Sequence, residues 1–310
     1  MPRNHGKKKI VVITGPTAAG KTAAAVEFAR LFGGDIVSAD SMQVYRYMTI
    51  GTAKPTEDER QQAPHHMVDV ADPDETFSAA RYATEASGIV DRLLEKGGTV
   101  FVTGGTGLYI EALLGGLIET PPADPELRRY YRDLAELHGT AYLHEMLQKN
   151  DPASAAAIHH HDRVRIIRAL EVLKHTGASI EGRRHEHAFS EKRYECLKIG
   201  IILDRHDLFQ RISERADVMI RDGLVEETEW LLNKGYDPSC PSLAAFSYRH
   251  IIEYLKAKLD KDEAVRRLKR DTRNYAKRQI TWFKRDRDIV WHEPGEREAA
   301  VEKISRFLFP

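Results

Sequence analysis

The chain has 310 residues, of which 42% are hydrophobic and 30% are charged, enough to bury the cores of about two domains. This composition excludes a disordered chain, a collagen-like repeat and a disulfide-rich scaffold. The 47 Lys and Arg residues balance the 47 Asp and Glu residues, so only the distribution of charge, not its sum, can indicate a nucleic-acid partner.

The two cysteines, Cys196 and Cys240, form no C-x-x-C pair, which argues against a disulfide framework and against a zinc cluster. We therefore expect reduced thiols in a cytoplasmic protein. The apolar stretch at 10–13 is too short for a signal peptide, and no other apolar run approaches the roughly 18 residues of a membrane helix. No membrane partner is expected.

The amino-terminal part alternates short β-branched runs with helical patterns. Such runs, bounded by glycine, are typical of buried parallel strands, and their alternation with helices predicts a parallel sheet covered on both faces. Strands are predicted at 10–14, 35–39, 67–70 and 99–103, and helices at 23–31, at 77–95 and after the glycine turn at 104–107.

From residue 123 the pattern changes to helices alone. Asp124-Pro125 and Asp151-Pro152 are typical helix starts, and Gly139 and Gly177 are typical helix ends. No strand is predicted between 123 and 177, whereas strands at 196–203 and 289–291 return to the sheet. The expected organisation is an α/β core of residues 1–122 and 190–310 with an all-helical insertion domain of residues 123–189.

A phosphate-binding loop lies between the first predicted strand and helix, in the pattern G-x-x-x-x-G-K-[ST]. Its backbone N–H groups point at an anion, Lys21 adds a positive charge, and the Thr22 hydroxyl can ligate Mg²⁺. The start of the following helix attracts the same anion. The motif predicts a phosphate or diphosphate site in a P-loop NTPase-like α/β core. Its residues are Gly15, Pro16, Thr17, Ala18, Ala19, Gly20, Lys21 and Thr22.

One carboxylate is well placed beside this loop. An NTPase normally carries an acidic residue on a neighbouring strand, but the strand at 99–103 runs into Thr-Gly-Gly. Asp40 instead follows the second predicted strand, at the edge of the sheet where ligands of open α/β folds bind. Asp40 is therefore a candidate Mg²⁺ ligand or general base; the alternative is a helix cap or a surface aspartate.

Several motifs together resemble the bacterial tRNA dimethylallyltransferases, also called tRNA isopentenyltransferases. They occur in that family's order over nearly the whole chain, and the run after Asp40 together with the second glycine turn is the most specific. The matching segments are the phosphate loop, Ser38-Ala39-Asp40-Ser41-Met42-Gln43, Gly51-Thr52-Ala53-Lys54-Pro55, His65-His66 with Asp69, Gly104-Gly105-Thr106-Gly107-Leu108-Tyr109, Arg165 with Arg168, Tyr275-Ala276-Lys277-Arg278-Gln279 and Thr281-Trp282-Phe283.

The resemblance implies transfer of a dimethylallyl group from dimethylallyl diphosphate to N6 of the adenosine next to the anticodon (position 37 of tRNA), with Mg²⁺ and with release of diphosphate. Lys21 and Mg²⁺ on Thr22 would then stabilise the leaving diphosphate, and Asp40 would act as the base. Thr106 would lie at the reacting adenine, although a structural role in the turn is the alternative.

Two further assignments concern the substrates. Ser41, Met42 and Gln43 follow Asp40 and are expected to contact the adenine, whose edge pairs well with an amide. Arg215 is expected to add a cation at the diphosphate, and a plain surface arginine is the alternative.

Two basic regions are candidates for binding RNA. Residues 266–287 contain ten basic and two acidic residues, a local charge of +8, beside an apolar stripe at helical spacing. Arg273 and Lys277 lie next to that stripe, and a solvated charged face is the alternative. A second group lies in the insertion, where the resemblance implies tRNA contacts by Arg128, Arg165 and Arg168. The predicted partner is the anticodon stem-loop, held by both regions. The second group comprises Arg163, Arg165, Arg168, Arg183 and Arg184.

Three other functions remain open from the residues alone: a P-loop small-molecule kinase, an adenylate isopentenyltransferase and an RNA-binding regulator that uses a nucleotide as a switch. Adjacent histidines on a helix point in different directions, so the tract His159-His160-His161 is not expected to bind zinc. Ser247 stands where the family usually has glycine, so no tRNA contact is transferred there. We expect a monomer.

Overall fold

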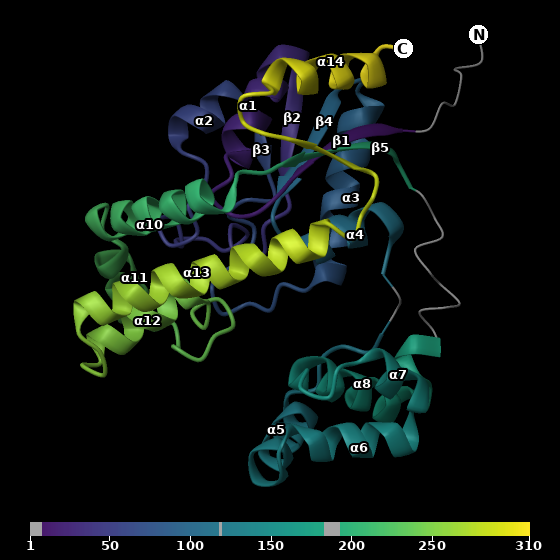
Figure 1. Cartoon of the computed structure of the whole chain (residues 1–310), viewed down its shortest axis with the longest axis vertical. Coiled ribbons are helices and arrows are strands. Elements are labelled where there is room, and N and C mark those ends of the chain that lie inside the picture. Colours follow the sequence, from purple (N-terminus) through teal and green to yellow (C-terminus); the bar gives the residue numbers. More distant parts are fainter. Residues whose placement is uncertain (1–7, 118–119, 183–192) are drawn as a thin grey trace. The chain divides into compact units, whose positions relative to one another are not determined.

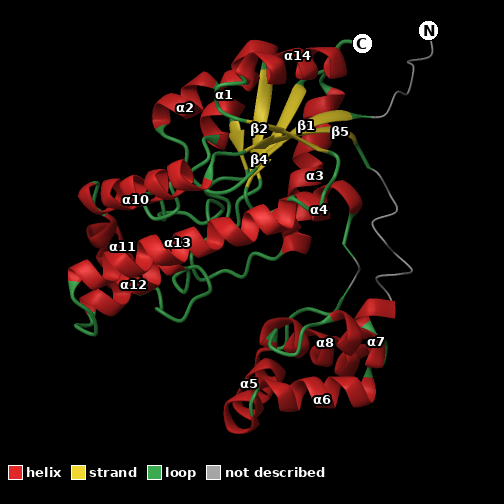
Figure 2. Cartoon of the chain, in the orientation of Figure 1, coloured by secondary structure: helices red, strands yellow, loops and turns green. Residues whose placement is uncertain are grey.

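The computed structural model describes residues 8–117, 120–182 and 193–310 (Figures 1 and 2). It divides into a unit of Met1–Gly115 with Lys192–Pro310 and a second unit of Gly116–Glu191. The predicted insertion of 123–189 thus lies within the second unit, which begins and ends slightly farther out.

The first unit contains one six-stranded sheet in which every paired strand is parallel. The order β3-β2-β4-β1-β5-β6 places β1 at the centre, between β4 and β5. The loops that follow β1, β2 and β4 therefore leave the same edge of the sheet. The strands are β1 (Lys9–Thr14), β2 (Gly34–Ser38), β3 (His65–His66), β4 (Thr99–Gly104), β5 (Glu195–Ile201) and β6 (Ile289–His292).

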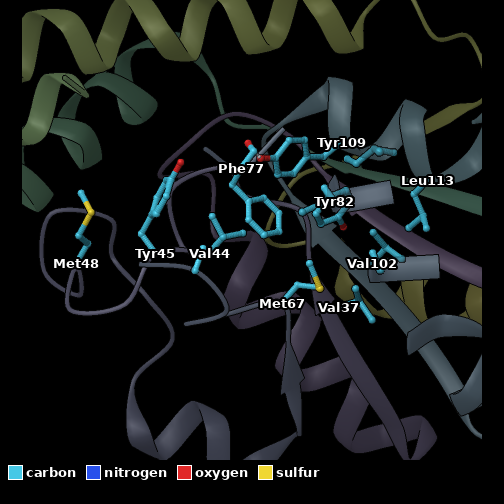
Figure 3. Close-up of a cluster of buried hydrophobic side chains, with 14 of the residues drawn as sticks. Val37, Val44, Tyr45, Met48, Met67, Phe77, Tyr82, Val102, Tyr109 and Leu113 are labelled. Atoms are coloured by element: carbon cyan, nitrogen blue, oxygen red, sulfur yellow. Dashed lines mark hydrogen bonds between the residues drawn. The ribbon is translucent and has the colours of Figure 1, made fainter. Parts of the chain in front are cut away.

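Both faces of the sheet are buried, because successive side chains of a strand point to opposite faces. Ile10 and Val12 of β1 enter one apolar cluster, whereas Val11 and Ile13 enter the other. This explains why the strands read as continuous apolar runs rather than as alternating ones. The first cluster is drawn in Figure 3, where Val37 and Val102 of two neighbouring strands share it with Phe77, Tyr82, Tyr109 and Leu113.

Helices cover both faces. Side chains of α3, α4 and α12 enter the cluster of Ile10 and Val12, and those of α1 and α14 enter the opposite one. The long helix α13 contributes to both. The helices of this unit are α1 (Lys21–Phe32), α2 (Glu57–Gln62), α3 (Ala79–Glu95), α4 (Gly107–Gly115), α10 (Arg205–Arg221), α11 (Leu224–Asn233), α12 (Phe246–Leu255), α13 (Lys261–Phe283) and α14 (Arg297–Leu308).

The second unit is helical throughout its described residues, with α5 (Pro125–His138), α6 (Thr140–Asn150), α7 (Pro152–Ala157) and α8 (Arg163–Thr176). Asp124 caps α5 by accepting hydrogen bonds from the N–H groups of Glu126 and Leu127, with proline at the first helical position. Gly177 ends α8 in the left-handed conformation. A small core forms around Leu143, Leu147 and Ile166.

Two sequence predictions about elements need correction. The strand predicted at 67–70 is wrong: β3 comprises only His65–His66, and the backbone turns afterwards because Met67 and Asp69 have φ values of 61° and 58°. The helix predicted at 77–95 begins at Ala79, because the Ser78 side chain accepts a hydrogen bond from the N–H of Arg81 and so fixes the first turn.

Membrane insertion finds no support in the helices of the described ranges, none of which is long and apolar enough to cross a bilayer.

Candidate active site

The loop between β1 and α1 has the backbone conformation of an anion-binding loop, here called the anion cradle. Gly15 and Gly20 have φ values of 140° and 96°, and Ala18 between them also has a positive φ of 65°. Alternation of this kind turns successive N–H groups inward. A Cβ on Gly15 would lie 2.2 Å from the carbonyl oxygen of Ile201, so glycine is required there. Gly20 is the residue before α1, whose first-turn N–H groups have no partners within the helix.

Two cations lie at this loop. The Lys21 ammonium donates a hydrogen bond of 2.7 Å to the carbonyl oxygen of Pro16, and Arg215 of α10 donates one of 3.3 Å to the hydroxyl of Thr17. Burial lowers the pKa of Lys21 to about 8, while the nearby Asp40 carboxylate opposes this shift. Burial likewise lowers the pKa of Arg215. A bound anion would offset the free-energy cost of holding these two positive charges partly away from water.

Asp40 lies two residues beyond the end of β2. Its Oδ1 atom accepts hydrogen bonds from the N–H groups of Met42 at 2.9 Å and Gln43 at 3.3 Å. Its Oδ2 atom accepts none from the described residues. The carboxylate is thus oriented by one oxygen and available through the other, as a general base requires.

Thr106 in the turn after β4 fixes the residues on either side of Asp40. Its N–H donates to the carbonyl oxygen of Ala39 at 3.1 Å, and its hydroxyl accepts from the N–H of Ser41 at 3.0 Å and donates to the Ser41 hydroxyl at 3.3 Å. A Cβ on Gly104 would lie 2.1 Å from the carbonyl oxygen of Ala39, so glycine is required for the end of β4 to lie this close to the residue after β2. Thr106 therefore belongs to the same site as Asp40.

The side chains after Asp40 are partly used inside their own loop. Gln43 accepts from the Ser38 hydroxyl at 3.0 Å and donates to the carbonyl oxygen of Ala53 at 3.0 Å, which leaves one N–H and one lone pair of its amide. Met42 is half-buried against the apolar cluster of Figure 3. Ser41 shares its hydrogen bonds with Thr106.

Aromatic residues belong to the apolar cluster against which Met42 packs (Figure 3). The rings of Tyr82 and Tyr109 stack with centroids 4.2 Å apart, and the Tyr109 hydroxyl donates to the carbonyl oxygen of Phe77 at 3.1 Å. Burial raises the pKa of Tyr109, and the charges of Tyr45 and Asp40 raise it further. The N–H of Tyr109 donates to the carbonyl oxygen of Thr106, in the turn that bonds to the residues on either side of Asp40, so the apolar cluster adjoins this loop.

The predicted RNA-binding residues of α13 lie beside an aromatic ring of α10. The Arg273 guanidinium and the Lys277 ammonium each lie 5.6 Å from the centroid of Phe209. Arg273 also donates to the Ser213 hydroxyl at 2.6 Å, whereas Lys277 is exposed. Lys277 is therefore the freer of the two cations.

The predicted RNA-binding arginines of the helical unit differ from one another. Arg128 and Arg168 both donate to the carboxylate of Glu171, which is fully buried. Arg165 is 58% exposed and pairs only with Asp162, at 3.4 Å. Arg183 and Arg184 lie outside the described residues.

A family model described as IPP transferase matches residues 43–286. The chain belongs to the IPP transferase family. This confirms the resemblance seen in the sequence motifs, and it makes the protein a prenyltransferase. Its relatives span nearly its whole length. It is 48% identical over 97% of each chain to tRNA dimethylallyltransferase 2 of Syntrophus aciditrophicus, and 47% identical to tRNA dimethylallyltransferase of Geobacter sulfurreducens over 98% of this chain and 97% of that one.

Solved structures of the IPP transferase family share the fold. The full-length tRNA isopentenylpyrophosphate transferase of Bacillus halodurans aligns over 97% of both chains with a TM-score of 0.71 and 36% identity. A eukaryotic dimethylallyltransferase acting on tRNA aligns over 96% of this chain and 78% of that one, with a TM-score of 0.79 and 27% identity. The predicted P-loop-like α/β class is confirmed.

Sequence reasoning missed Glu227 of α11, which holds the loop of this IPP transferase that follows Gln43. The Glu227 carboxylate accepts hydrogen bonds from the N–H groups of Thr49, Ile50 and Gly51 at 2.8–3.0 Å. It also accepts one from the Tyr248 hydroxyl at 2.8 Å. The acidic first turn of α11 gave no signal, because the loop it binds lies more than 170 residues away in the chain.

The histidine tract of this family member shows no metal cluster. Within the described ranges, no group of three or more His, Cys, Asp or Glu side chains is placed to hold a metal ion. The rings of His159 and His160 stack on each other with centroids 4.4 Å apart.

Proposed function

We propose that this chain transfers the dimethylallyl group of dimethylallyl diphosphate to N6 of the adenosine next to the anticodon, position 37 of tRNA. The observation that carries the proposal is the convergence of an anion cradle and an oriented carboxylate at one edge of the sheet, in a member of the IPP transferase family. The relatives named tRNA dimethylallyltransferase support the choice of substrates.

The donor side consists of the loop Gly15–Thr22 with Lys21 and Arg215. Negative charge develops on the leaving diphosphate as the allylic C1–O bond breaks, and preorganised N–H groups and cations are the groups that stabilise it. Lys21 and Arg215 are both half-buried, and burial lowers the pKa of each; partial removal from water strengthens their interaction with an anion.

The Thr22 hydroxyl at the start of α1 suits Mg²⁺, because this ion prefers oxygen ligands and commonly shares them with phosphates. No hydrogen bond within the described residues occupies that hydroxyl. When bound, Mg²⁺ would neutralise part of the diphosphate charge.

The acceptor side consists of Asp40 and Thr106. The N6 lone pair forms a bond to C1 of the donor while the C1–O bond breaks, and the surplus N6 proton passes to Oδ2 of Asp40. Thr106 orients Asp40 through the residues on either side of it, Ala39 and Ser41, and lies where the adenine would enter. Ser41, Met42 and the remaining polar atoms of Gln43 line the same loop and would contact the adenine.

For the rest of the tRNA we propose electrostatic contacts. Lys277 and Arg273 of α13 and Arg165 of the helical unit are the cations whose exposure or position suits a phosphate backbone. Arg128 would reach RNA only with the guanidinium edge that Glu171 does not use, whereas Arg168 also donates to the Thr120 hydroxyl and to the carbonyl oxygen of Pro121. We place the reaction in the cytoplasm and in a monomer.

The test is a transfer assay with unmodified tRNA, labelled dimethylallyl diphosphate and Mg²⁺, followed by mapping of the label to a nucleoside. We expect label on the adenosine next to the anticodon. Phosphorylation of a small acceptor by ATP without use of the prenyl donor would favour a kinase instead. Labelling of free adenine nucleotides but not of tRNA would indicate an adenylate isopentenyltransferase, and tRNA binding without any modification would indicate a regulator.

A further inference from the structure

We infer that Gln279 of α13 is a positioning residue that sets the spacing between the donor loop and the acceptor turn. The inference rests on the proposed function, because it assigns those two loops to the prenyl donor and to the adenine. The Gln279 side chain would contact neither substrate.

The Gln279 amide joins two loops that the sequence separates by about ninety residues. Its Oε1 atom accepts a hydrogen bond of 2.8 Å from the N–H of Thr17 in the donor loop, and its Nε2 donates one of 2.9 Å to the carbonyl oxygen of Gly105 in the acceptor turn. The side chain is 5% exposed. Buried hydrogen bonds of this kind are costly to break, since the freed backbone groups lose their partner away from water.

The primary amide of Gln279 satisfies both loops at once. The donor loop presents an N–H and the acceptor turn presents a carbonyl oxygen, so the bridging group must accept on one side and donate on the other. A carboxylate at this position would have no proton for Gly105 and would bring negative charge next to the diphosphate cradle. An apolar side chain of similar size would leave both backbone groups unpaired.

The absence of a side chain at Gly105 is explained by the same contact. A Cβ there would lie 2.1 Å from Nε2 of Gln279, and its nearest other neighbour, the carbonyl oxygen of Gly15, would be 3.7 Å away. Gly105 does not adopt the left-handed backbone that favours glycine. The space that glycine leaves is therefore space for the Gln279 amide and for nothing else nearby.

Two other residues of α13 pack against the turn after β4, which carries Thr106. Trp282, three residues along the helix, lies against Gly107, where a Cβ would come within 2.1 Å of the indole nitrogen. Tyr275, one turn before Gln279, interacts with the side chains of Thr106 and Gln279. Three positions on one face of α13 thus fix the turn that carries Thr106, and Gln279 alone among them also bonds to the donor loop.

The consequence for the reaction is geometric. The donor loop follows β1 and the acceptor turn follows β4, which are adjacent parallel strands. Transfer requires N6 and C1 at about 3–3.5 Å in line with the leaving oxygen, and an error of about 1 Å can lower the rate about a hundredfold. Loss of the Gln279 bridge should therefore slow the chemical step without weakening the binding of either substrate.

The test compares Gln279→Met, which keeps the volume and removes both hydrogen bonds, with Gly105→Ala, which pushes the amide aside. Thr281→Ala, an exposed position on the same helix, is the matched control. Single-turnover rates with saturating tRNA and dimethylallyl diphosphate should fall about a hundredfold for the first two variants and stay within about twofold for the control. Dissociation constants for tRNA and for the donor should stay within about threefold in all of them.

The double variant Gly105→Ala/Gln279→Met sharpens the test, because two changes that break one bridge should not add. We expect its rate to match that of the slower single variant within about threefold. Three outcomes would overturn the inference. The effects of the two changes could multiply in the double variant, the single variants could keep a single-turnover rate near that of the wild type, or the loss could appear only in the dissociation constants. If Gln279→Met fails to fold, Gly105→Ala decides alone, because only the end of a flexible side chain must move. An inactive wild-type protein would refute the proposed function instead.

Discussion

The two units of this IPP transferase use their basic side chains in opposite ways. At the donor loop, the half-buried side chains of Lys21 and Arg215 hydrogen-bond to neutral loop groups. In the helical unit, Arg128 and Arg168 share the buried carboxylate of Glu171, whose single negative charge offsets one of their two positive charges. A half-buried cation without a carboxylate hydrogen-bond partner indicates a place for an anion, whereas removing a buried carboxylate that two cations share destabilises the fold. Basic residues must therefore be sorted by their partners before they are assigned to a substrate.

The largest expected effect is at the donor loop. Lys21→Ala should lower kcat/KM for dimethylallyl diphosphate about a thousandfold, because it removes a preorganised charge from the leaving group in a water-poor site. Steady-state kinetics with tRNA held at saturation would measure this, and the melting temperature should change little. An unchanged rate and donor affinity would show that the loop does not bind the donor.

In the helical unit, the corresponding change should affect stability rather than chemistry. Glu171→Gln should destabilise α5–α8 by about 3 kcal/mol, since two arginines lose a buried partner. Hydrogen–deuterium exchange of the full chain would detect this as faster exchange within residues 125–176. Exchange at the wild-type rate would mean that the cluster is not structural and that both arginines are free for RNA.

The same cluster predicts a dependence on pH. Burial alone would raise the pKa of Glu171, but hydrogen bonds from Arg128, Arg168 and the Asp124 N–H outweigh it and hold the pKa below its ordinary value. The unfolded state then binds the proton more readily, so the contribution of Glu171 is present above pH 4.5 and is lost as the pH falls below that value. Relative to the intrinsic exchange rate of unprotected amides at each pH, protection in α5–α8 should fall in acid for the wild type and fall less for Glu171→Gln.

A smaller effect on the rate is expected from replacing Asp40, the proposed general base. Asp40→Asn should lower kcat about tenfold to a hundredfold while tRNA still binds, because the amide keeps its hydrogen bonds to the loop but cannot take the N6 proton. Single-turnover kinetics would measure it. Turnover close to that of the wild type would remove Asp40 from the role of base.

The smallest effect concerns the exposed cations. Affinity for tRNA should fall steeply with salt, and Arg165→Ala or Lys277→Ala should each reduce the slope of log K against log salt by about 1. Arg306→Ala, an exposed arginine of α14 paired with Glu302, is the control with the same loss of charge. Equal slopes for the wild type and all three variants would contradict both contacts.

Much of the fold could be predicted because its signals are local. The glycine loop, the capped helix at Asp124-Pro125 and the apolar runs of β1 and β4 each depend on a few neighbouring residues, and the structure places these elements where they were expected. The strand at 67–70 was wrong because β-branched residues also fill irregular segments, and two residues with positive φ turn the chain there.

The candidate site was only partly predictable. Asp40 and Thr106 could be singled out because each follows the carboxyl end of a parallel strand. The hydrogen bonds of Thr106 to Ala39 and Ser41, on either side of Asp40, follow from the pairing of β2 with β4. Gln279 could be placed on a buried stripe, but its two partners could not be named. Glu227 gave no signal, because three of its partners are backbone N–H groups, which nearly every residue type carries, and all of its partners lie far from it along the chain.

By itself, the sequence determined the family, the class of fold, the anion cradle and the carboxylate beside it, since each is encoded in short segments whose chemistry depends on spacing along the chain. Only the tertiary structure decided which cations lie at the phosphate loop and which pair with a carboxylate. It also decided which side chain joins the phosphate loop to the turn after β4. Those properties depend on contacts between residues that are far apart in the chain, where periodicity and propensity carry no information.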